Sequence, residues 1–110
     1  MKTLEKLQNT TIISIDAILD YWQITTEVAV ISIYTSVECA RHSTLGATFE
    51  LTDLSETIGR TITAVKYSPD DAFVLETDNS LLMRVPLSES ACVTPEAVCI
   101  HYMTGEIVVM

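Results

Sequence analysis

The stretch that most constrains the fold of this chain covers residues 58–86, where turn residues separate three short runs rich in β-branched and apolar residues. Gly59 ends a short segment with helical spacing, and glycine is typical of that position because it adopts a left-handed backbone without steric cost. Pro69 follows the first run and Asp78 the second, and both residue types favour tight turns. The stretch therefore predicts a helix end followed by a three-stranded meander. The three predicted strands cover residues 61–68, 72–77 and 80–86.

A similar order of signals is found nearer the N-terminus. Two leucines three residues apart predict a short helical turn, and β-branched and aromatic runs predict strands after it. A shift of 50 residues places Thr11 on Thr61. We interpret residues 3–35 and 53–87 as degenerate copies of one unit with a helix and three strands. The alternative is that the alternation of apolar residues alone makes the sequences of two meanders similar. The N-terminal strands are expected over residues 11–16, 21–26 and 28–34.

The C-terminal segment, residues 97–110, predicts a hairpin, because two apolar runs flank a turn that contains Gly105. Residues 36–48 show no strand or helix pattern and are expected to form a loop. With 110 residues, 48% of them apolar, the chain is expected to form one domain over residues 1–110. The predicted fold class is α+β and strand-dominated: one antiparallel sheet of about eight strands built from the two units, with one or two short helices and the C-terminal hairpin.

Acidic residues dominate the charge of the chain. Fifteen Asp and Glu against six Lys and Arg give a net charge of -9. This balance disfavours nucleic acid and anionic membranes as partners, because phosphate binding depends on clustered Lys and Arg. It favours a basic protein partner, although the charge could also serve solubility alone. The longest apolar-rich run, residues 28–34, is far shorter than the roughly 20 residues that cross a bilayer.

The three cysteines, Cys39, Cys92 and Cys99, are an odd number at unrelated spacings. No charged-then-apolar leader precedes them, so we expect neither secretion nor a disulfide framework, and we predict a cytoplasmic location. Two of them lie near the histidines His42 and His101, and four such side chains could bind zinc. The alternative is that Cys99 is an ordinary core residue and that His101 is hydrogen-bonded or on the surface. We predict no metal and no cofactor.

Catalytic signatures are absent from the sequence. The same Cys-His pairs could form a thiol nucleophile, but a reactive thiol needs an electropositive setting that a chain of this charge seldom provides. Glycine-rich phosphate loops are also absent, because the three glycines stand apart from one another. We therefore expect that the protein is not an enzyme.

Acids at the predicted turns are the candidates for partner contact. Asp70 and Asp71 lie at one end of the second predicted strand of the central meander, and Glu76 and Asp78 lie at its other end. If the strands pair as predicted, these carboxylates gather at the ends and edge of one sheet, where they can meet Lys or Arg of another protein. The alternative is a solvated rim. The residues predicted to bind a partner are Asp70, Asp71, Glu76, Asp78, Glu89 and Glu96.

Several motifs of the C-terminal half resemble those of a family of small bacterial β-rich proteins. That family carries an Ile/Val-Gly-Arg-x-Ile/Val-Thr strand opening, a Pro-Glu-Ala segment and a Gly-Glu-x-x-Val strand. The corresponding motifs begin here at Ile58, Pro95 and Gly105. The resemblance implies a β-rich domain and no assigned reaction. In size, charge and fold class the chain also resembles the immunity proteins that bacteria encode beside secreted toxins.

These inferences together predict a non-catalytic acidic interaction protein. The leading hypothesis is an immunity protein that binds and neutralises a cognate bacterial toxin through an acidic sheet edge. The alternative is a structural or small-ligand-binding domain that forms a homodimer through an unpaired edge strand such as residues 106–110. A metal-dependent or thiol enzyme is a third class, which stoichiometric zinc in the purified protein would favour.

Overall fold

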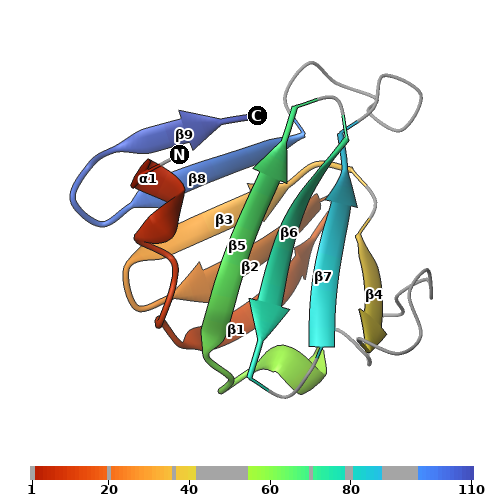
Figure 1. The fold of residues 1–110 in the computed structure, drawn as a ribbon. Helices are drawn as coiled ribbons and strands as arrows, with labels where there is room; N and C mark the ends of the chain where they lie inside the picture. Colours follow the sequence, from red (N-terminus) through yellow and green to blue (C-terminus); the bar gives the residue numbers. More distant parts are fainter. Residues whose placement is uncertain are drawn as a thin grey trace.

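The computed structural model describes residues 2–19, 21–35, 37–41, 55–69, 71–78, 81–87 and 97–110. Within these residues the chain forms nine strands, one four-residue helix and one 3₁₀ turn (Figure 1). The helical elements are α1 (Lys2–Glu5) and η1 (Ser55–Thr57). The strands are β1 (Ile12–Ile18), β2 (Tyr21–Thr26), β3 (Ala29–Ile33), β4 (Glu38–Arg41), β5 (Ile62–Ser68), β6 (Ala72–Thr77), β7 (Leu81–Pro86), β8 (Val98–Tyr102) and β9 (Ile107–Val109).

The strands form two antiparallel sheets. The first sheet has the order β1-β2-β3-β8-β9, and the second has the order β4-β7-β6-β5. The two sheets lie one behind the other in Figure 1 and share one apolar core. Ile31 and Ile100 of the first sheet and Phe73 of the second are fully buried in that core. Leu4 and Leu7, in and after α1, are also buried and belong to the same core.

The predicted α+β class, with one sheet of about eight strands, is therefore wrong. Helical structure in the described part of the chain is limited to α1 and η1, and the fold is of the all-β kind. The physical reason is that each meander has one apolar face. Packing two such faces against each other removes both from water, whereas one or two short helices cannot cover a single broad sheet.

The two predicted meanders are both present and have matching geometry. β1-β2-β3 and β5-β6-β7 are antiparallel, and in each the register shifts near the start of the first strand. Thr11 and Thr61, which are 50 residues apart, form an antiparallel bridge with each other. Asn9 and Gly59, also 50 residues apart, both have a left-handed backbone, with φ of 64° and 84°. Two copies of one unit would produce this local two-fold arrangement, and the duplication stays a prediction.

The chain crosses from one sheet to the other after β3 and again after β7. β4 follows β3 along the chain but pairs with β7, and β8 follows β7 but pairs with β3. The sequence predicted a loop over residues 36–48, and it was wrong for β4. This strand has only four residues and no apolar alternation, so its pairing with β7 defines it. The predicted C-terminal hairpin is confirmed as the antiparallel pair β8 and β9.

Candidate protein-binding surfaces

Three of the six acids predicted to bind a partner are described, and they lie along β6. Asp71 immediately precedes this strand, Glu76 lies within it, and Asp78 immediately follows it. Because a strand rises about 3.3 Å per residue, Asp71 and Asp78 are separated by roughly 23 Å. The structure thus places these two carboxylates at opposite ends of one strand and does not bring them into one cluster. The other three predicted residues, Asp70, Glu89 and Glu96, lie outside the described residues.

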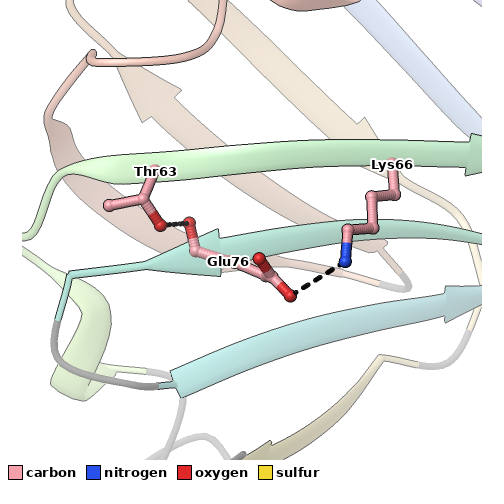
Figure 2. A network of polar contacts seen from close by, with 3 residues as sticks. All are labelled: Thr63, Lys66 and Glu76. Atoms are coloured by element: carbon pink, nitrogen blue, oxygen red, sulfur yellow. Dashed lines mark hydrogen bonds and ion pairs between the residues drawn. The ribbon is translucent and has the colours of Figure 1, made fainter.

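Two of these carboxylates contact cations of their own sheet. Lys66 Nζ lies 3.3 Å from Glu76 Oε1 across the β5–β6 pair, and Thr63 Oγ1 donates to the Glu76 carbonyl oxygen at 3.3 Å (Figure 2). Arg84 Nη2 donates to Asp71 Oδ1, also at 3.3 Å. Ion pairs at a protein surface contribute about 0–1 kcal/mol each. The Asp71 side chain is 70% exposed, so it can exchange Arg84 for a cation of a partner at small cost. The Glu76 side chain is only 17% exposed and is much less accessible to a partner.

The outer face of the first sheet has a different character, because almost all of its side chains are uncharged. The cross-strand register places ten residues on this face, in two rows across the five strands. Ser32, in the middle strand, is buried, and the other nine are at least partly exposed. One row is Ser14, Thr25, Val30, His101 and Ile107, and the other is Asp16, Gln23, Ser32, Cys99 and Val109. Asp16 is the one acid among the ten, and the set contains no Lys or Arg. We call this set the neutral face.

The neutral face was not predicted from the sequence. Its signal is the lack of charge at alternate positions of five strands, and that signal becomes visible only once the strand order is known. Two tyrosines continue the face at one end: the rings of Tyr21 and Tyr34 lie 5.0 Å apart. Trp22, the neighbour of Tyr21, packs against the core instead. Depletion of charge and enrichment of tyrosine are typical of the centre of protein interfaces.

β9 is an edge strand of the first sheet and pairs only with β8. Ile107 and Val109 are 59% and 49% exposed, whereas Val108 between them packs against the core. An edge strand with exposed apolar side chains is a template on which another strand can add. β9 is therefore a second candidate for contact with another chain.

A hollow of about 380 Å³ lies beside the turn between β2 and β3 and the turn between β8 and β9. It is lined by Lys6, Glu27, Val28, Tyr102, Met103 and Thr104. Its two charged residues have partners within the chain: Glu27 Oε1 accepts from the Thr11 N–H at 2.7 Å, and Lys6 forms an ion pair with Glu106.

Lys6 Nζ also lies 5.6 Å from the centre of the Tyr102 ring. Burial raises the pKa of the Tyr102 hydroxyl above its usual range, and the nearby negative charge of Glu106 raises it further. Tyr102 therefore keeps its proton and is no base at neutral pH. The hollow presents mainly apolar surface, which suits a small apolar group.

The four side chains considered for zinc are divided in the structure. Cys99 and His101 lie on β8 of the first sheet, and Cys39 lies on β4 of the second. His42 is outside the described residues. Across the described part of the chain, no group of three or more His, Cys, Asp or Glu residues could hold a metal ion.

No helix among the described residues has the length and apolar character needed to cross a membrane.

Comparison with known proteins found no protein-family model, no curated protein and no solved structure that matches this chain. The resemblance to the family of small bacterial β-rich proteins and to immunity proteins stays a prediction. Proposals on function therefore depend on three features of the molecule itself: the acids along β6, the open edge of β9 and the hollow beside the β8–β9 turn.

Proposed function

We propose that this chain is a non-catalytic interaction protein of the immunity type, which binds and neutralises a basic toxin domain. The observation that carries the proposal is the position of Asp71 and Asp78. Both carboxylates are exposed, and they flank β6 at its two ends on a chain with a net charge of -9. A basic partner that covers the second sheet would contact both ends of the strand.

The dimensions of this surface fit an ordinary protein interface. Each partner of a stable complex typically buries about 800 Å², the area of a disc about 32 Å across. The roughly 23 Å between Asp71 and Asp78 fits within that disc. Between the two ends, Lys66 is paired with Glu76, whose side chain is only 17% exposed, so Lys66 presents little repulsion to a basic surface.

Neutralisation would occur by steric occlusion, because a bound domain of this size covers the substrate site of a small toxin. Charge complementarity would act mainly on the association rate. Opposite charges steer two proteins toward each other before contact, and salt screens them over about 10 Å at 0.1 M. Association is therefore expected to be fast and to slow markedly as salt is added.

The test is reversal of Asp71 and Asp78 to Lys, compared with a matched control in which Glu5 and Asp16 are reversed. Each double variant replaces two acids with two lysines and so changes the net charge from -9 to -5, and all four residues are exposed. The binding partner in this test is a catalytically inactive variant of a basic toxin domain that is encoded beside this gene. Association rates are measured by stopped flow at low and physiological salt.

We expect the Asp71 and Asp78 variant to associate at least about tenfold more slowly at low salt, with its circular dichroism unchanged, and the control to lose much less. Equal losses in the two variants would show that net charge, and not this surface, controls the encounter. An unchanged rate in the first variant would overturn the proposed surface.

A structural or small-ligand-binding role as a homodimer is the second candidate function. It is favoured by the open edge of β9 and by the apolar hollow beside the β8–β9 turn. This role requires no toxin, so it predicts self-association in the purified protein alone.

A further inference from the structure

The edges of the two sheets differ in how they are protected against another strand. Edge strands usually carry charged residues, bulges or proline, which oppose pairing with other chains. β1 has a register shift and Asp16, and β5 has a register shift and Lys66. β4 contains Glu38 and Arg41. Among these four described edges, β9 has neither a charged residue nor a register shift within Ile107–Val109.

The extended segment is longer than the three residues of β9, because hydrogen bonds continue on both sides of it. The Tyr102 N–H donates to the Glu106 carbonyl at 2.9 Å, and the Met110 N–H donates to the Val98 carbonyl at 2.9 Å. Residues 106, 108 and 110 thus direct their backbone groups toward β8. Since this direction alternates along an antiparallel strand, Ile107 and Val109 direct theirs away from β8.

No backbone hydrogen bond joins the N–H or carbonyl groups of Ile107 and Val109 to any residue that the structure describes. In Figure 1, β9 is the outermost strand, and among the drawn elements only β8 runs beside it in the sheet. Within the described residues, four polar backbone groups at two successive outward positions thus have no backbone partner.

We infer that β9 pairs antiparallel with β9 of a second copy of this chain, about a two-fold axis at Val108, so that two five-stranded sheets become one ten-stranded sheet. In this register Ile107 lies opposite Val109 of the second copy, and Val109 lies opposite Ile107 of the second copy. Both such pairs can exchange two N–H···O bonds, which engages all the outward groups of the two residues. The inference gives a register to the homodimer of the second candidate function, and it is independent of the proposed toxin binding, which uses the other sheet.

A second copy fits this edge better than an arbitrary partner because the register avoids like charges at the contact. Glu106 lies opposite Met110 of the second copy, and the two copies of Glu106 are separated by four residues, or roughly 13 Å. Glu106 is also ion-paired with Lys6 of its own chain. The paired side chains Ile107 and Val109 are β-branched and apolar, which is a favourable cross-strand combination.

The contact is small, and this determines the strength to expect. Two segments of five residues bury much less than the about 800 Å² per partner of a stable complex, so the dimer should form reversibly and depend on concentration. Two chains of net charge -9 also repel each other at long range. Salt screens this repulsion, so added salt should strengthen the dimer, whereas it should weaken the binding of a basic toxin.

Hydrogen exchange at single amides tests the register. We expect the amides of Ile107 and Val109 to become more protected as protein concentration rises, while the amide of Val108, which points toward β8, shows constant protection. Sedimentation over the same concentrations should show a monomer-dimer equilibrium that shifts toward dimer with added salt. Concentration-independent exchange at Ile107 and Val109, or a monomer at every concentration, would overturn the inference.

Variants separate this edge from other surfaces. Ile107→Lys places a cation on the edge of β9, and Ile13→Lys is its matched control, since Ile13 is a similarly exposed isoleucine (54% against 59%) on the edge strand β1. We expect Ile107→Lys to raise the dimer dissociation constant at least about tenfold and Ile13→Lys to leave it nearly unchanged. Val109→Pro removes the outward N–H of Val109 and no N–H that points toward β8, so it should also weaken the dimer. Equal effects of the Ile13 and Ile107 variants would place the contact elsewhere.

Discussion

Replacing Thr26 with Val is expected to loosen the connection between β2 and β3 and to lower the free energy of unfolding. Thr26 is fully buried at the end of β2. Its Oγ1 donates to the Ala29 carbonyl at 3.2 Å and accepts from the N–H groups of Val28 at 3.2 Å and Ala29 at 3.1 Å. Val has nearly the shape of Thr but no hydroxyl, so the substitution retains the packing and removes three hydrogen bonds.

The magnitude follows from those three bonds. An intramolecular hydrogen bond contributes about 1 kcal/mol net, so the loss of all three would cost about 3 kcal/mol. The Val28 N–H is only partly buried and can bind water after the substitution, which reduces the cost to about 2 kcal/mol. Against a total stability of about 5–15 kcal/mol for a domain, this is a large effect, equivalent to a fall in Tm of roughly 8 °C.

Urea unfolding followed by the fluorescence of Trp22 measures this change. Thr26→Ser is the matched control, because it retains the hydroxyl and removes one methyl group, at a cost of about 0.8 kcal/mol. We expect the order of stability to be wild type, then Thr26→Ser, then Thr26→Val. If Thr26→Val were as stable as the serine variant or more so, the hydroxyl would not hold the turn, and the reasoning would be refuted.

Two further predictions concern the backbone at Gly59 and the titration of Tyr102. Gly59→Ala should lower the free energy of unfolding, measured in urea, by about 1–2 kcal/mol. The φ of Gly59 is +84° and nothing lies within 4 Å of the added Cβ, so backbone strain is the whole cost. An unchanged free energy of unfolding would contradict this reasoning. For Tyr102, burial and Glu106 raise the pKa of the hydroxyl in the folded state. The unfolded state therefore loses this proton at lower pH than the folded state does. The free energy of unfolding should thus fall as the pH rises above about 10, the ordinary tyrosine pKa. Glu106→Gln should lower the Tyr102 pKa in an ultraviolet absorbance titration, and an unchanged titration would show that Glu106 has no such influence.

The acids along β6 show how far the candidate site could be predicted. The turn signals at Pro69 and Asp78 correctly placed Asp71 before β6 and Asp78 after it. They could not show that Lys66 and Arg84 lie beside Glu76 and Asp71, because those contacts depend on the register of β6 with its two neighbours. The neutral face was beyond prediction for the same reason, since its rows cross five strands.

The sequence by itself therefore determined the elements that depend on residues close together in the chain. The two meanders and the C-terminal hairpin follow from turn residues and from the alternation of apolar side chains. The unpaired edge at residues 106–110 was also expected from the sequence, and β9 lies at the edge of its sheet. Tertiary structure alone decided that β4 is a strand and that β3 pairs with β8. Pairing β3 with β8 joins residues about 70 positions apart, such as Ile31 and Ile100. Which distant strands meet depends on how two apolar faces bury each other, and no local pattern in the chain encodes that choice.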